Sequence, residues 1–283
     1  MNIPPEHATL KNSKVVIVPF GYEATTTYKT GTKDGPDAII SASKQVELYD
    51  CELECEPYEA GIATIAQLEM DRKDYYKPIK QLKSQTAKLI KMGKFPIILC
   101  GEHSLSFGPI AAFAEAYPDL VVLHIDAHAD LRDEFEGTIY SHAAVMRRVI
   151  DVAPLVQLFI RNISKDEAEF VKTTDRTKIF YDHDYRAKKW NVKDVIKALG
   201  NRPVYLSIDV DGFSPEVIPA TGTPEPGGAS WHDVLDILRE VFREKNVVGA
   251  DIVELAPMAG SIYSDFTIAK LAYKLVGYKY FLK

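Results

Sequence analysis

The chain has 283 residues, 46% of them hydrophobic, so it can bury a large core as one α/β domain or as two smaller ones. Its 34 basic and 40 acidic residues give a formal net charge of −6, which argues against a nucleic-acid-binding surface. The first ten residues hold no apolar core segment, so we expect no signal peptide, no membrane association and a cytoplasmic location.

Short apolar runs rich in β-branched residues alternate with stretches of helical period along the chain. Helices are expected to include 79–92 and 234–242, and Ser230 with Asp233 predicts a capping box before the second. Strands that alternate with helices form βαβ crossovers, so the pattern predicts a parallel sheet covered on both faces. No linker interrupts it, and we expect a single domain over residues 1–283. The expected strands are 15–20, 96–100, 121–125, 156–160, 179–181, 204–208 and 247–255.

Polar clusters follow the predicted strands at the points where the strands end. Asp126, His128 and Asp130 alternate with alanines directly after one strand, and Asp209 and Asp211 follow another. On an extended backbone, residues i, i+2 and i+4 point to one face, so each group can converge on one point. Because ligands of open parallel sheets bind beyond the carboxyl ends of the strands, the sequence predicts a metal site there.

Two further polar residues stand at the ends of other predicted strands. His103 follows 96–100 in the run Gly101-Glu102-His103, and Glu254 closes the last strand. With four aspartates, two histidines and no thiolate, the donor set favours an oxygen-loving divalent ion such as manganese. The formal charge of −4 on four aspartates is cancelled by two divalent ions. Without such ions, the clustered carboxylates would repel one another.

These blocks together resemble those of the ureohydrolases, the arginase and agmatinase family. The resemblance runs from Val18-Pro19-Phe20-Gly21 to Glu254, and the segment from Thr221 to Gly228 is most similar to the agmatinase branch. It implies a three-layer α/β/α, arginase-like fold with a central parallel sheet. It also implies a centre of two Mn²⁺ ions per chain, held by His103, Asp126, His128, Asp130, Asp209 and Asp211.

The activity that the resemblance implies is hydrolysis of agmatine to putrescine and urea through a metal-bridging hydroxide, a step of polyamine biosynthesis. Asp130, His142 and Glu254 would form the catalytic set. His142 would donate a proton to the leaving amine, and Glu254 would pair with the guanidinium through its carboxylate. The family also implies a homotrimer or homohexamer.

Substrate choice is expected to depend on the loop 131–139. Three acids, among them Asp133, would repel an α-carboxylate and favour a small substrate with a cationic tail, so agmatine is the leading candidate and Asp133 a candidate substrate-binding residue. Arg132 in the same loop leaves guanidinobutyrate open.

Other readings of the same residues remain open at this point. The chain could be a guanidinobutyrase or an arginase, a deacetylase-type enzyme with one zinc ion, or a metal-binding family member without activity. Glu102 stands where the family commonly has aspartate, and Ala143 where agmatinases commonly have glycine. His124 is expected to be a hydrogen-bonded core histidine and not a ligand.

Overall fold

The computed structural model describes residues 2–68, 70–71 and 74–282. Its eight strands form one sheet in the order β2-β1-β3-β8-β7-β4-β5-β6, and every neighbouring pair is parallel. The strands are β1 (Val15–Phe20), β2 (Ile62–Thr64), β3 (Phe95–Cys100), β4 (Val121–Ile125), β5 (Leu155–Ile160), β6 (Thr177–Tyr181), β7 (Val204–Asp209) and β8 (Val247–Val253).

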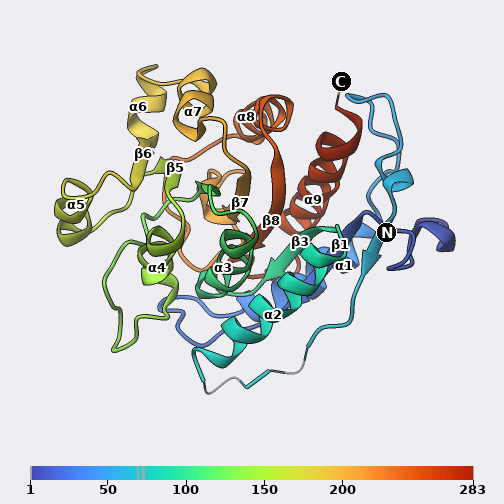
Figure 1. Ribbon diagram of the computed structural model, residues 1–283, viewed down its shortest axis with the longest axis horizontal. Coiled ribbons are helices and arrows are strands. Elements are labelled where there is room, and N and C mark those ends of the chain that lie inside the picture. Colours follow the sequence, from blue (N-terminus) through green and yellow to red (C-terminus); the bar gives the residue numbers. More distant parts are fainter. Residues whose placement is uncertain (1, 69, 72–73, 283) are drawn as a thin grey trace.

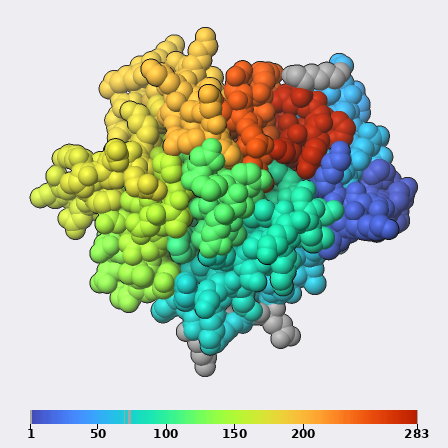
Figure 2. Space-filling model, viewed as in Figure 1, coloured from blue at the N-terminus to red at the C-terminus, as the bar shows by residue number. Residues whose placement is uncertain are grey.

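Helices cover both faces of the sheet (Figure 1). One face packs against α2, α3 and α4, and the other against α1, α7, α8 and α9. Figure 2 shows α2 and α3, in cyan and green, over the middle of the visible face. The helices are α1 (Gly35–Ser43), α2 (Lys77–Lys91), α3 (Phe107–Ala116), α4 (Val145–Val152), α5 (Lys165–Val171), α6 (Asp182–Arg186), α7 (Val192–Leu199), α8 (Trp231–Glu244) and α9 (Tyr263–Phe281).

The predicted three-layer α/β/α fold with a central parallel sheet is confirmed. All seven expected strands are present. The strand that sequence analysis missed, β2, has only three residues, too few for a periodic pattern to show. The last strand ends at Val253 and not at residue 255, so Glu254 lies just beyond the sheet. Within the described residues, no helix is both long and apolar enough to cross a bilayer.

The order of the strands brings four carboxyl ends together at the middle of the sheet. β8 and β7 lie between β3 and β4, although they come last in the chain. The register aligns Leu99 of β3 with Ile252 of β8, Ile252 with Ile208 of β7, and Ile208 with Ile125 of β4. The loops that leave these four strands therefore begin at the same level.

The capping box expected before α8 is confirmed. Ser230 Oγ accepts a hydrogen bond from the Asp233 backbone N–H at 3.1 Å, and the Asp233 carboxylate accepts one from the Ser230 N–H at 2.9 Å. Two N–H groups at the helix start, which have no partner within the helix, are satisfied in this way.

Ser230→Ala is expected to lower the free energy of unfolding by about 1 kcal/mol, because one helix N–H loses its acceptor. Ser230→Asp keeps an acceptor at the same place and should retain most of the stability. Urea denaturation of the three proteins at equal metal content measures the difference. Equal midpoints for Ser230→Ala and the parent protein would contradict a stabilising cap.

Candidate metal centre

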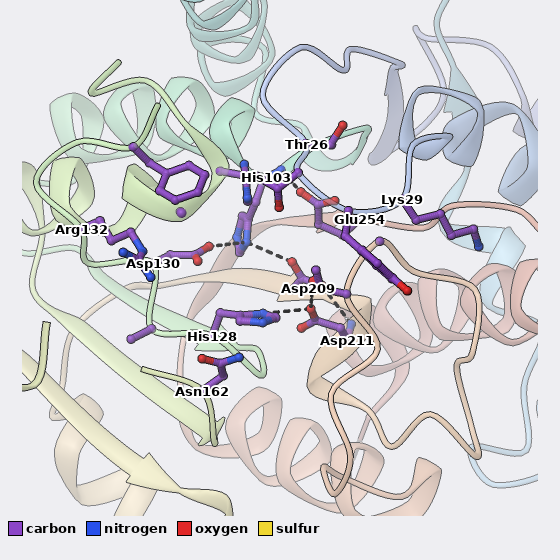
Figure 3. Close-up of a pocket in the computed structure, with 18 of the residues that line it drawn as sticks. Thr26, Lys29, His103, His128, Asp130, Arg132, Asn162, Asp209, Asp211 and Glu254 are labelled. Carbon is purple, nitrogen blue, oxygen red and sulfur yellow. Dashed lines mark hydrogen bonds and ion pairs between the residues drawn. The ribbon is translucent and has the colours of Figure 1, made fainter. Parts of the chain in front are cut away.

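The loops after the four central strands place their polar side chains around one cavity of about 170 Å³ (Figure 3). His103 follows β3 at the start of a short 3₁₀ helix, Asp130 follows β4, Asp209 ends β7, and Glu254 follows β8. All four line the cavity and are buried. The site is therefore built by strand ends that are distant in sequence.

The first group of ligand atoms surrounds the His103 ring. Its Nδ1 lies 3.2 Å from an Oδ2 atom of each of Asp126, Asp130 and Asp209. Figure 3 shows the ring between the Asp130 and Asp209 carboxylates. One imidazole nitrogen and three carboxylate oxygens, all from buried residues, thus converge on a small volume.

The hydrogen bonds of His103 determine its tautomer, that is, which ring nitrogen carries the proton when the ring is neutral. Ser207 Oγ donates its only proton to Asp251 Oδ1 at 2.8 Å, so it accepts from His103 Nε2–H at 3.1 Å. In the neutral ring, the Nδ1 lone pair therefore points at three carboxylate oxygens. This nitrogen has no hydrogen-bond partner within the described structure. A cation at this point removes the repulsion, so the residues fit a metal ion.

A second group of ligand atoms lies beside the first. His128 Nδ1 is 3.0 Å from Asp211 Oδ2 and 3.5 Å from Asp126 Oδ1. The Asp211 backbone N–H donates to Asp209 Oδ1 at 2.9 Å, which fixes the Asp209 carboxylate of the first group against the backbone of Asp211. Asp126 faces both groups, with Oδ2 toward His103 and Oδ1 toward His128. The donors therefore form two adjoining sets, and neither contains a thiolate.

Burial makes negative charge on three acids of the cavity unfavourable in the absence of cations, whereas contacts with His124 and His103 outweigh burial and hold the pKa of Asp126 well below its ordinary value. Burial, with the nearby charge of Asp126, raises the pKa of Asp130 to about 7. Burial and the neighbouring Asp211 hold the pKa of Asp209 well above its ordinary value. The pKa of Glu254 is likewise raised well above its ordinary value, by burial and by Glu102.

Two of the cavity residues have a left-handed backbone. Asp130 has φ 54° and Glu254 has φ 66°, a region that residues other than glycine rarely adopt. Asp130 therefore reaches the cavity through a turn after β4 and not along the extended backbone that the alternating pattern predicted. Such strain persists only where surrounding contacts hold it, and here it occurs at two of the acids that line the cavity.

His142 lines the same cavity, and its side chain is hydrogen-bonded to Thr25. Thr25 Oγ1 donates to Glu102 Oε1 at 2.9 Å, so it accepts from His142 Nδ1–H at 3.2 Å. Burial lowers the pKa of His142 to about 4, which keeps the ring neutral at pH 7 and leaves Nε2 without a proton. Sequence analysis gave no signal for Thr25.

Glu102, the departure from the family pattern, anchors the segment that carries Thr25. Its carboxylate accepts from the backbone N–H groups of Ala24 at 2.5 Å and Thr25 at 2.7 Å, and from the Ser104 hydroxyl. Glu102 therefore acts on the site through the Thr25 segment and so through His142.

Asp133 is not brought to the cavity. Its side chain is 82% exposed and pairs with Arg148 at 3.0 Å. Its contact with a substrate tail stays a prediction. The cavity is instead lined by Lys29, Arg132 and Asn162 among other residues. In the loop 131–139, Arg132 therefore lines the cavity, whereas Asp133 lies outside it.

This arrangement of strand ends and donors matches a known protein family. The family model described as the arginase family matches residues 13–277. The chain belongs to the arginase family. An N(1)-aminopropylagmatine ureohydrolase of Synechocystis sp. is 38% identical over 274 residues, which cover 94% of this chain and 89% of that protein.

Further relatives are similar in sequence and in structure. An agmatinase of Bacillus anthracis is 34% identical over 89% of this chain and 87% of its own length. The crystal structure of agmatine ureohydrolase of Thermoplasma volcanium superposes with a TM-score of 0.87 at 29% identity and covers 95% of this chain and 90% of that one. The protein is thus an agmatinase-like ureohydrolase. Its family depends on two metal ions, and the buried His/Asp cluster provides the donors for them.

Metal removal is expected to lower the melting temperature, by about 5 °C or more at pH 8 and by less at pH 5. The folded-state pKa of Asp130 is raised from 3.8 to about 7. Its stabilising contribution to the metal-free protein is therefore present below 3.8 and lost as the pH rises to about 7. Metal binding is also stronger when the ligands are deprotonated.

Thermal unfolding with and without manganese at the two pH values measures this difference. Asp130→Asn, which cannot ionise at this position, should make the stability of the metal-free protein less dependent on pH. A melting temperature that chelation leaves unchanged at pH 8 would contradict a metal centre.

Proposed function

We propose that this ureohydrolase hydrolyses agmatine to putrescine and urea with two manganese ions bound. The observation that carries the proposal is the meeting of two metal-ligand sets with Glu254 and His142 at one cavity. A guanidinium resists attack by neutral water. When bound, two divalent ions supply water activated as a nucleophile at neutral pH.

Six residues would hold the two ions. Their hard oxygen donors and imidazoles, without thiolate, suit manganese, and each ion would neutralise part of the carboxylate charge. The ligands are His103, Asp126, His128, Asp130, Asp209 and Asp211.

Glu254 would bind the substrate guanidinium. Its Oε1 accepts from the His103 N–H at 2.6 Å, which fixes the carboxylate beside the first ligand set. Burial disfavours its charge, so a cationic guanidinium that pairs with it gains more than it would in water. The carboxylate therefore both orients the guanidinium carbon and selects a cation.

His142 would transfer the proton that the reaction requires. As water oxygen bonds to the guanidinium carbon and the bond from that carbon to the alkyl-bearing nitrogen breaks, one of the two water protons is released to solvent, and the other must reach the departing amine. The neutral ring, with Nδ1–H held by Thr25, has Nε2 available to take this proton and pass it on. The products are then urea and the free amine.

Two observations bear on the substrate tail. The Synechocystis relative is named for aminopropylagmatine, which carries a longer cationic tail than agmatine, and this supports that compound as a second candidate. Lys29 and Arg132 line the cavity and would suit an acidic tail, as in guanidinobutyrate. The names of the relatives support a substrate with a cationic tail. The conformation of Lys29 and Arg132 decides how much room the cavity leaves for that tail.

A substrate series decides between these tails. We expect urea release from agmatine or aminopropylagmatine at a kcat/KM at least about 100-fold above that for arginine, because the relatives are named for substrates that carry no α-carboxylate. 4-Guanidinobutyrate is the acid-tailed control. A preference for arginine would overturn the proposed function, and a preference for guanidinobutyrate would assign Lys29 and Arg132 to the tail.

His142→Ala is expected to lower kcat by about 100- to 10,000-fold while both metal ions remain bound, because it removes the proton carrier and no ligand. The matched control is His183→Ala, since the His183 side chain is 73% exposed and lies outside the cavity. Kinetics combined with a metal count per chain test this. An unchanged kcat in His142→Ala would remove the assigned role.

A further inference from the structure

A row of four polar side chains crosses the sheet beneath the metal-ligand sets. In register along β5, β4, β7 and β8 stand Gln157, His124, Ser207 and Asp251, which we call the polar row. All four are fully buried and lie on the sheet face that packs against α3 and α4. Such residues inside apolar strands are unfavourable unless every polar atom is paired, so their arrangement is informative.

The orientation of the Gln157 amide is fixed by two partners outside the row. Its Nε2 donates to the Ala129 backbone carbonyl at 2.8 Å, and its Oε1 accepts from the Thr177 hydroxyl at 3.2 Å. A carbonyl can only accept, so the amide nitrogen must lie on this side. The same nitrogen lies 3.0 Å from His124 Nδ1 and donates to it.

The tautomer of His124 follows from that hydrogen bond. Because Nδ1 accepts from Gln157, the proton of the neutral ring is on Nε2. Nε2 lies 2.7 Å from Asp126 Oδ2 and donates to it. His124 therefore has no lone pair to offer an ion, although it lies close to the ligand atoms. Its proton instead holds one oxygen of a ligand.

Asp126 is the carboxylate that faces both ligand sets. Oδ2, held by His124, lies 3.2 Å from His103 Nδ1, and Oδ1 accepts from the His128 N–H at 2.5 Å. The hydrogen bond from His124 prevents the carboxylate from rotating about its Cβ–Cγ bond. The next residue of the row, Ser207, accepts from His103 Nε2–H. Two of the four residues of the first set, Asp126 and His103, are thus oriented from below.

We propose that His124, with its tautomer fixed by Gln157, is a positioning residue that orients Asp126 for metal binding. This inference rests on the proposed function, because it assumes that ions occupy the two sets. Groups that orient ligands from outside change metal affinity by roughly 10- to 100-fold when removed. The polar row therefore sets how tightly an ion is bound by the first ligand set, the one around His103.

The test compares two substitutions that differ in a single property. In His124→Gln the side-chain amide can place an N–H near the position of the imidazole Nε2 and still donate to Asp126. In His124→Leu no donor remains. Equilibrium dialysis and electron paramagnetic resonance of Mn²⁺ give the number and affinity of bound ions for each purified protein.

We expect His124→Leu to weaken one of the two manganese affinities by roughly 10- to 100-fold and His124→Gln by less than about threefold. The melting temperature of the metal-free proteins separates a loss of metal-ligand orientation from a packing defect. A packing defect lowers the melting temperature, but it does not make the manganese affinity of His124→Leu differ from that of His124→Gln. If His124→Leu does not fold, Gln157→Leu replaces it. That variant frees the tautomer, so the ¹⁵N shifts of His124 should change together with the affinity.

The outcomes separate this inference from the proposed function. A parent protein that binds no manganese would overturn both. A parent that binds two ions, with variants whose affinities equal its own, would overturn the role of His124 and leave the proposed function in place.

Discussion

The mutual repulsion of buried carboxylates is the constraint on which this structure depends. Asp126, Asp130 and Asp209, all buried, place oxygen atoms at equal distances from one imidazole nitrogen. Such an arrangement is stable only with protons or cations between the oxygens. The raised pKa of Asp130 shows the first solution, and two divalent ions provide the second. The chemistry of the site follows from the second.

The sheet topology makes this concentration of charge possible. β3, β8, β7 and β4 are buried and, apart from the polar row, mainly apolar, and each is followed or ended by a polar residue at the cavity. Because the four strands are adjacent and aligned, their polar ends meet without any element that must bend toward the site. Asp130 and Glu254 follow two of these strands with a left-handed backbone.

Much of this architecture could be predicted from the sequence, for a physical reason. A polar residue directly after an apolar run marks the end of a buried strand, and that signal located Asp126, Asp209 and Glu254. The order of the strands was beyond reach, because the insertion of β7 and β8 between β3 and β4 depends on contacts distant in sequence. Asp133 shows the same limit for loops, since its charge predicted attraction to a substrate but not its pairing with Arg148.

The polar row was missed, although its signal is present in the printed sequence. Gln157 and Asp251 interrupt runs that are otherwise apolar, and a polar residue within a buried strand must have a partner. The sequence does not reveal that these residues share one register with His124 and Ser207. Their importance comes from alignment across the sheet, which a single strand cannot show.

The most direct test of the central claim is the position of bound metal. Anomalous diffraction at the manganese edge from crystals grown with Mn²⁺ should show two peaks, one beside His103 and one beside His128, with Asp126 between them. A single peak, or peaks away from these residues, would contradict the account.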